Sequence, residues 1–241
     1  MRLPCFALPS LVLNLPGINH FAFDAAIVDL DGTMVDTLGD FAVALNRMLD
    51  DLDLPHIGAQ AIEAMVGKGS EHLIQSVLRH VREGLPPDET LFDSAWARYL
   101  HHYLDVNGQY STVYGGVVEG LQALRAKGLR LACLTNKPTS FARPLLAAKG
   151  LDGFFEQTFG GDAFERKKPD PLPLLKTCEA LGTLPARTLM IGDSSNDARA
   201  ARAAGCPVVL VSYGYNHGEP VRSVDADGFI DSLAELGRPA D

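Results

Sequence analysis

The sequence predicts an α/β protein with a doubly wound, parallel, Rossmann-like sheet and a helical domain inserted into it. Short apolar runs without alternation recur along the chain, which is typical of strands covered on both faces. Helical patterns lie between these runs, and strand–helix–strand alternation indicates a parallel sheet. One long helical segment without a convincing strand separates the first run from the second. Its position indicates an insertion and not a tandem domain.

Four apolar runs are predicted to form buried parallel strands: 25–30, 129–134, 188–191 and 208–211. A weaker strand is expected around residues 157–160. The core helices are expected at segments that each end at a glycine, a common helix stop: 116–128, 140–150 and 194–205. Because these helices fall between strands, each is placed to cover a face of the sheet.

The segment 37–114 contains successive helical patterns, among them "DFAVALNRMLDDL", "SEHLIQSVLRHV" and "ETLFDSAWARYLHHYL". We interpret it as a helical cap inserted into the core, which then consists of residues 21–36 and 115–241. Residues 1–20 are interpreted as an N-terminal extension. Prolines interrupt the apolar start of this extension, which disfavours a signal peptide and a membrane span. An export or anchoring role remains the alternative.

The composition excludes some classes of function. The net charge of −9 argues against a nucleic-acid or anionic-membrane surface, since both require clustered Lys and Arg. The four cysteines have no CxxC spacing, which favours reduced core cysteines and a cytoplasmic location. A chain of 241 residues can bury a sizeable core without disulfides or a structural metal. We expect a small phosphorylated metabolite as partner, no nucleic acid, no membrane, and a monomer or small homo-oligomer.

Four polar clusters begin at or just after the carboxyl ends of predicted strands: "DLDGT" (29–33), "TN" (135–136), "RKKPDP" (166–171) and "GDSSND" (192–197). In an open parallel sheet, ligands bind in the crevice beyond these strand ends. The clusters are therefore expected to converge, although they span most of the chain.

The chemistry of these clusters indicates a metal and a phosphoryl group. Asp29, Asp31, Asp193 and Asp197 would gather four carboxylates in one crevice, and hard oxygen ligands without His or Cys favour Mg²⁺. Cation and donor groups nearby, such as Lys168 and the Thr135 hydroxyl, suit a dianionic phosphoryl group. The sequence has no GK[ST] phosphate loop and no evident Ser–His or Cys–His pair. An aspartate is therefore the natural nucleophile, which implies an aspartyl-phosphate intermediate.

These four motifs, in this order and with a helical insertion after the first, resemble the haloacid dehalogenase (HAD) superfamily of phosphohydrolases. The resemblance covers nearly the whole chain beyond residue 21. Finer matches resemble the bacterial phosphoglycolate phosphatases: "VDTLGDFAVALNRML" after the first motif, "VGKGSEHLI" in the cap, "LTNKP" at the second motif and "SYGYNHGEP" near the end.

The resemblance implies a role for each motif residue. Asp29 would attack phosphorus, and Asp31 would protonate the leaving alkoxide and then deprotonate the attacking water. Thr135 and the backbone of Asn136 would hold the phosphoryl oxygens. Lys168 would steady the nucleophile and the developing charge; a solvated basic loop is the alternative for this lysine, because two basic residues precede it.

The same resemblance implies a Mg²⁺ site. Asp29 and Asp193 would bind the metal through their carboxylates, and Asp31 through its main-chain carbonyl. Asp197 would support the site through water or a hydrogen bond, or would be a simple helix N-terminal charge. In the cap, the "GKG" segment (67–69) is interpreted as a specificity loop in which Lys68 meets a substrate carboxylate; an exposed turn is the alternative.

The expected function is Mg²⁺-dependent phosphomonoester hydrolysis, most specifically of 2-phosphoglycolate to glycolate and phosphate. A phosphatase for other small phosphates, such as sugar phosphates or nucleoside monophosphates, is the main alternative. A phosphohexomutase of the same superfamily is disfavoured, because "DTLGDFAVAL" lacks the cap-side His that such relatives usually carry. An idle binding module is disfavoured too, because Asp29, Asp31, Lys168 and Asp193 are all present.

Overall fold

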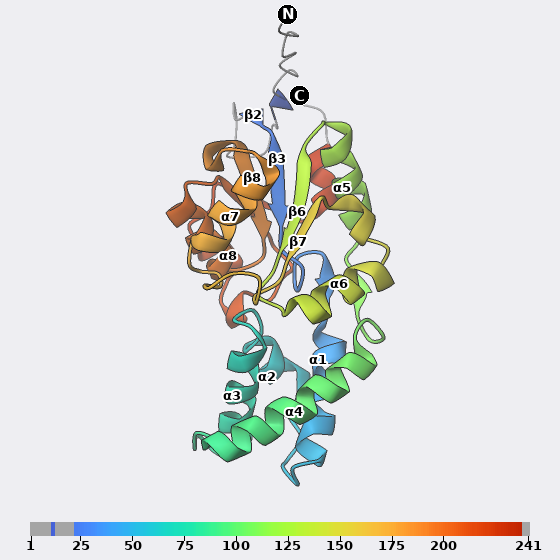
Figure 1. Ribbon diagram of the computed structural model, residues 1–241, viewed down its shortest axis with the longest axis vertical. Helices are drawn as coiled ribbons and strands as arrows, with labels where there is room; N and C mark the ends of the chain where they lie inside the picture. The colour runs from blue at the N-terminus through green and yellow to red at the C-terminus, as the bar shows by residue number, and fades with distance from the viewer. Residues whose placement is uncertain (1–10, 13–21, 238–241) are drawn as a thin grey trace, which may run out of the picture.

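The computed structural model describes residues 11–12 and 22–237, and its centre is a six-stranded parallel sheet (Figure 1). The strand order is β10-β9-β8-β3-β6-β7. The strands are β3 (Ala25–Val28), β6 (Arg130–Leu134), β7 (Gln157–Phe159), β8 (Thr188–Gly192), β9 (Val208–Val211) and β10 (Gly228–Ile230). All neighbouring strands of this sheet pair in parallel, as the continuous apolar runs predict.

Helices cover both faces of the sheet. They are α5 (Val117–Ala126), α6 (Thr139–Ala148), α7 (Leu172–Leu181) and α8 (Ser195–Ala204). The first two pack in one hydrophobic core, and α7 and α8 pack in another; Figure 1 shows α5 and α7 on opposite sides of the sheet. Along β3, Ala26 and Val28 belong to the first core, while Ala25 and Ile27 belong to the second. Both faces are buried, which explains the absence of alternation.

The remaining core elements are short. Two antiparallel pairs join β1 (Leu11–Val12) to β2 (Ala22–Phe23) and β4 (Val35–Asp36) to β5 (Thr112–Val113). The 3-10 helices are η1 (Asp152–Phe154), η2 (Pro185–Arg187), η3 (Asn216–Gly218), η4 (Val221–Ser223) and η5 (Leu233–Gly237). None of the described helices is both long and apolar enough to cross a membrane.

A helical cap is inserted between β4 and β5, beyond the carboxyl edge of the sheet (Figure 1). It consists of α1 (Leu38–Asp50), α2 (Ala59–Glu63), α3 (Ser70–Val81) and α4 (Glu89–Val106). The cap helices enclose a second hydrophobic core, in which Leu45, Ile74 and Tyr99 are fully buried and which Phe141 and Tyr215 of the α/β core join. Apolar burial therefore stabilises the cap and also holds it against the core.

The structure differs from the predicted elements in a few places. The first predicted strand ends earlier, at Val28, and the weak strand expected at 157–160 is β7. The prediction missed α7, although Gly182 (φ +63°) ends it in the left-handed conformation typical of a helix stop. It also missed β10, which has three residues and is too short for a periodic pattern.

Two further sequence predictions concern cysteines and the N-terminus. Cys133, Cys178 and Cys206 are buried and free, whereas Cys5 lies outside the described residues. Apart from Leu11–Val12, the predicted extension over residues 1–20 also lies outside them.

Asp40 links the two chain segments that join the cap to the core by hydrogen bonds between them. Its side chain is fully buried, and its carboxylate accepts hydrogen bonds from the backbone N–H groups of Gly108 (2.8 Å) and Tyr110 (2.7 Å). A Cβ on the neighbouring Gly39 would lie 2.2 Å from the Tyr110 carbonyl oxygen. The close approach of the two segments therefore requires glycine at 39 and an acceptor at 40.

We expect Asp40→Ala to lower the free energy of unfolding by about 2–4 kcal/mol, because it leaves two buried N–H groups without an acceptor. Urea denaturation followed by circular dichroism measures the change. The control is Asp93→Ala on the exposed face of α4, for which we expect a change within about 0.5 kcal/mol. Equal stability of Asp40→Ala and the wild type would contradict this structural role.

Candidate active site

The four polar clusters meet at the carboxyl edge of the sheet, on the side that faces the cap. Asp29 follows β3, Thr135 follows β6, and Asp193 follows β8. Lys168 reaches the same place from the loop between β7 and α7, where its Nζ lies 3.0 Å from Asp29 Oδ1. The convergence expected from the parallel topology is therefore present.

Lys168, and not its basic neighbours, enters the site. Its side chain is buried, and Nζ also lies 2.7 Å from Asp197 Oδ1 and donates to the Leu134 carbonyl oxygen at 2.9 Å. Lys167 instead pairs with Glu71 at the surface. Burial opposes the charge on Lys168, but Asp197 and Asp29 outweigh it and raise the pKa of the ammonium above its ordinary value. Lys168 is thus a firmly charged group between two carboxylates.

Three buried carboxylates surround this single ammonium. The carboxylates of Asp29, Asp193 and Asp197 have oxygens within 4.8 Å of one another. Burial, only partly offset by Lys168, raises the pKa of Asp29 to about 7. Burial and the charges of Asp197 and Asp29 raise the pKa of Asp193 well above its ordinary value. When ionised, the three carboxylates carry more negative charge than Lys168 balances, and a bound cation relieves that imbalance.

The individual oxygens suggest how the acidic residues divide their roles. Asp29 Oδ1 is buried and accepts no well-directed hydrogen bond, although Lys168 Nζ lies close to it. Asp193 Oδ2 accepts from the Tyr215 N–H at 2.7 Å. Asp197 is the most fully engaged, since Oδ1 meets Lys168 and Oδ2 accepts from the N–H and hydroxyl of Ser194 in the capping box of α8. Asp197 is therefore an N-terminal charge of α8 and also a member of the acidic cluster, while its support of a metal stays a prediction.

The backbone conformation and the close packing at position 32 explain why "DLDGT" contains a glycine. The φ of Gly32 is +79°, in the left-handed region that favours glycine. A Cβ at this position would lie 2.2 Å from Asp193 Oδ2. Any other residue would therefore push the loop after β3 away from the loop after β8.

Asp31 lies slightly further from the sheet, toward the cap. Its Oδ1 accepts from the Thr37 hydroxyl at 2.8 Å and from Lys137 Nζ at 3.0 Å. Lys137 Nζ also donates to the Tyr103 hydroxyl at 2.6 Å. Sequence reasoning missed Lys137 and Tyr103 as neighbours of the site. Lys137 had a detectable signal, because it follows Thr135 closely at the end of a predicted strand.

A cavity of about 30 Å³ separates core and cap beside these groups. Asp29, Asp31, Thr135 and Lys137 line it from the core, together with Asn136, and Phe41, Val66, Gly67, Gly69, Ser70 and Leu73 line it from the cap. The cavity has room for about two water molecules. Lys68 does not line it: although Gly67 and Gly69 do, the Lys68 side chain is exposed.

Asparagine side chains connect the site to the cap loop. The carbonyl oxygen of Gly67 accepts from Asn136 Nδ2 at 3.1 Å and from Asn196 Nδ2 at 3.2 Å. The Asn136 side chain also bonds the backbone N–H and carbonyl of Lys168 at 3.0 and 2.8 Å. Sequence reasoning considered only the backbone of Asn136, whereas its side chain links the Lys168 loop to the cap.

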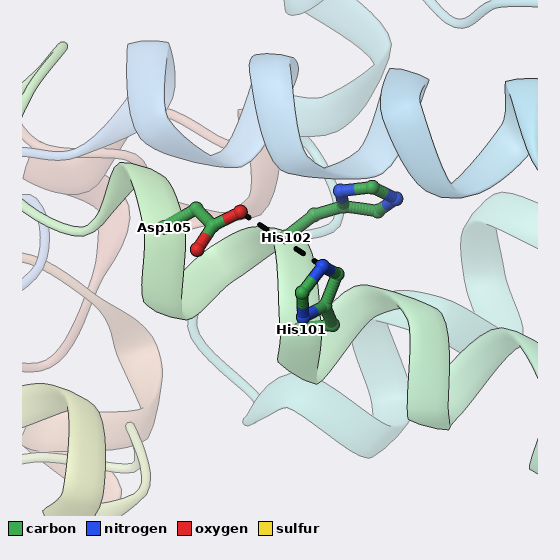
Figure 2. A group of neighbouring side chains, drawn as sticks. All are labelled: His101, His102 and Asp105. Atoms are coloured by element: carbon green, nitrogen blue, oxygen red, sulfur yellow. Dashed lines mark ion pairs between the residues drawn. The ribbon is translucent and has the colours of Figure 1, made fainter.

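A second group of metal-ligand residue types lies on α4, away from this edge (Figure 2). His101 and Asp105 are exposed and lie 3.9 Å apart, while His102 Nε2 contacts Asp51 Oδ2 at 2.7 Å. Figure 2 shows the His102 ring against the neighbouring helix. The pair lies on the surface of the cap, and proximity alone assigns no function to the group.

Comparisons with known proteins agree with this geometry. Residues 23–205 match the family model of the haloacid dehalogenase-like hydrolases. The chain is 46% identical to the phosphoglycolate phosphatase of Thiobacillus denitrificans and 44% identical to that of Nitrosospira multiformis, covering 88% of this chain and 92% of each relative.

A comparison of folds with a solved structure indicates the same family. The crystal structure of a predicted phosphoglycolate phosphatase from Haemophilus somnus matches with a TM-score of 0.85 and 34% identity, over 89% of this chain and 96% of that chain. Family model, relatives and fold agree with the four motifs at the carboxyl edge of the sheet. The chain therefore belongs to the haloacid dehalogenase-like hydrolases, and within them it is an enzyme similar to the phosphoglycolate phosphatases.

Proposed function

We propose that this enzyme is a Mg²⁺-dependent phosphomonoester hydrolase that forms an aspartyl-phosphate on Asp29, and that its substrate is 2-phosphoglycolate. The observation that carries the chemistry is the convergence of Asp29, Lys168 and Asp193 at one edge of the sheet. The substrate is supported by the names of the relatives and by the small cavity beside Asp31.

The residues present fit a Mg²⁺ ion. The donors are oxygens only, the cluster has excess negative charge, and Asp29 Oδ1 lacks a well-directed hydrogen bond. We assign the ion to the carboxylates of Asp29 and Asp193 and the main-chain carbonyl of Asp31, with Asp197 supporting them. When bound, Mg²⁺ supplies positive charge that offsets the carboxylates and the phosphoryl oxygens.

In the first half of the reaction, an Asp29 carboxylate oxygen attacks phosphorus and the phosphorus–oxygen ester bond breaks. Asp31 donates a proton to the leaving oxygen, and Thr37 holds this carboxyl in place through its 2.8 Å hydrogen bond. The Thr135 hydroxyl and the Asn136 N–H bind phosphoryl oxygens. Lys168 balances negative charge as the new bond forms on Asp29.

In the second half, Asp31 acts as a base. It takes a proton from a water molecule, the resulting hydroxide attacks the phosphoryl group, and the bond to Asp29 breaks. Phosphate is released and the Asp29 carboxylate is regenerated. One residue thus serves as acid and then as base, because the first step leaves it as the carboxylate that the second step requires.

We assign residues 37–114 to the cap, with the core formed by 21–36 and 115–241. The cap covers Asp29 and Asp31 and excludes bulk water during the reaction, and its movement releases the product. The contacts of Gly67 with Asn136 and Asn196 form and break in that movement. A cytoplasmic location, a monomer or small homo-oligomer, and the absence of nucleic-acid partners stay predictions.

The small size of the cavity bears on the choice of substrate. A space for about two water molecules is smaller than any of the phosphate esters considered, so each of them requires the cap to move outward. A short leaving group requires the smallest movement. This favours 2-phosphoglycolate over sugar phosphates, nucleoside monophosphates and the hexose phosphate of a phosphohexomutase.

A Mg²⁺-supplemented phosphate-release panel tests the substrate. We expect kcat/KM for 2-phosphoglycolate to exceed that for glucose 6-phosphate, AMP and pyrophosphate by about 100-fold or more, because a poorly fitting leaving group loses several favourable contacts. A flat profile would remove the substrate assignment and leave the phosphatase chemistry in place.

The substitution Asp29→Asn tests the nucleophile. We expect turnover to fall by about 10⁴-fold or more, because the amide cannot form the phosphoryl-enzyme. The melting temperature should stay equal or rise, because the substitution removes a buried charge from a crowded cluster. Differential scanning fluorimetry checks the fold. Ordinary turnover by the folded variant would refute the covalent mechanism.

The substitution Asp193→Asn tests the metal site. For the wild type at 100 times the dissociation constant, Mg²⁺ should add about 2.7 kcal/mol of stability. We expect most of this increment to vanish in Asp193→Asn, while the metal-free variant is at least as stable as the metal-free wild type. The control Asp152→Asn, on the exposed surface of the core, should keep the full increment. An undiminished Mg²⁺ effect in Asp193→Asn would exclude it as a ligand.

A further inference from the structure

Lys137 provides the cavity between core and cap with a cation that the phosphoryl chemistry does not use. It follows β6, and only 4% of the residue is exposed. Its Nζ lies 3.0 and 3.3 Å from the two carboxylate oxygens of Asp31 and 2.6 Å from the Tyr103 hydroxyl. It is the one cationic side chain among the described residues that line the cavity.

Aromatic rings hold this ammonium in place. Lys137 Nζ lies 4.5 Å from the centroid of Phe41 and 4.6 Å from that of Tyr103. Both rings come from cap helices, so the cap positions a cation that the core supplies. Cation–π contacts of this kind attract a desolvated ammonium without neutralising it.

The two buried lysines of the site have different environments. Lys168 Nζ meets the carboxylates of Asp29 and Asp197 and the carbonyl oxygen of Leu134. Lys137 Nζ donates to both carboxylate oxygens of Asp31 and to the Tyr103 hydroxyl. It is paired with one carboxylate where Lys168 is paired with two, and its 3.3 Å contact is the longest of the three. A ligand carboxylate in the cavity would take the N–H of that longest contact.

Among the described residues, the cap wall of the cavity carries no charged side chain, and the carboxylates of the core wall, Asp29 and Asp31, are each paired with a lysine. The cap contributes Phe41, Val66 and Leu73, which are apolar, and Ser70, which is a neutral hydroxyl. A carboxylate, with three heavy atoms, is close in size to the two water molecules for which the cavity has room. The chemistry that matches this wall is a small carboxylate, which pairs with an ammonium through a charge-assisted hydrogen bond.

We propose that Lys137 is the specificity-determining residue that binds the carboxylate of the substrate's leaving part. It thereby selects short phosphorylated hydroxy acids over neutral phosphate esters of the same size. This inference rests on the proposed phosphatase function. It assigns to Lys137 the role that the sequence suggested for Lys68, whose side chain is exposed and does not line the cavity.

The experiment compares 2-phosphoglycolate with 2-hydroxyethyl phosphate, which carries a neutral CH₂OH in place of the carboxylate. The quantity measured is the ratio of the two kcat/KM values, in the wild type and in Lys137→Met, which keeps an apolar stem without charge. We expect the ratio to fall by about 10- to 100-fold in the variant, as for the loss of a hydrogen bond to a charged group. Loss of the partner of Asp31 lowers activity on both esters and cancels in the ratio.

Lys68→Met is the matched control, and its ratio should stay within about threefold of the wild type, since this lysine is exposed. If Lys137→Met does not fold, Lys137→Gln replaces it, because its amide still donates to Asp31 and Tyr103 without charge. An equal loss on both esters would show that Lys137 only holds Asp31, and would overturn the proposal. If the ratio of the two kcat/KM values falls in Lys68→Met and not in Lys137→Met, the substrate carboxylate binds at the cap loop. That result would also overturn the proposal about Lys137.

The activities of the wild-type enzyme on the two esters distinguish a failure of this inference from a failure of the proposed function. If the wild type hydrolyses both esters with a ratio near one, the phosphatase chemistry stands and the role of Lys137 is refuted. If it hydrolyses neither ester with Mg²⁺ present, the proposed function fails and the inference about Lys137 fails with it.

Discussion

The main constraint on the site is electrostatic repulsion among Asp29, Asp193 and Asp197. These carboxylates are buried together around the single ammonium of Lys168. Burial makes ionised carboxylates costly, and their mutual repulsion adds to that cost. The protein keeps them in place with fixed donors: the capping box of α8 holds Asp197, and the Tyr215 N–H holds Asp193. The remaining negative charge is available to a cation, so this costly arrangement suits the proposed metal and phosphoryl group.

The same acidic cluster is connected to the segment that leads from the core into the cap. The Tyr215 N–H donates to Asp193, and its hydroxyl accepts from the Thr37 N–H and donates to Asp36 Oδ1, both at 2.8 Å. Thr37 in turn donates its hydroxyl to Asp31. The segment that leads into the cap is therefore bound on one side to the acidic cluster and on the other to the proposed acid–base. Tyr215 and Thr37 thus connect Asp193, the entry to the cap and Asp31 through direct hydrogen bonds.

Core and cap contribute different parts of the site. In the proposed mechanism, the sheet edge provides the groups that act on the phosphoryl group: the carboxylates, Thr135 and Lys168. The cap borders the cavity with Phe41, and the rings of Phe41 and Tyr103 contact the core residue Lys137. A fold built in this way can keep its chemistry while the inserted helices change its selectivity, which agrees with the range of hydrolases that share this core.

The sequence alone determined the α/β class, the inserted helices and the residues that meet at the carboxyl edge, because apolar runs and the polar residues that end them are local patterns. It also favoured Lys168 over its basic neighbours, and the structure buries only that one in the site. Only the tertiary structure decided that Lys137 and not Lys68 lines the cavity, and that the Asn136 side chain reaches the cap. These facts depend on how the cap and the core face each other. The local sequence of the cap or of the core does not show which residues of the other segment it contacts. Contacts between residues far apart in the chain could therefore not be inferred from either segment by itself.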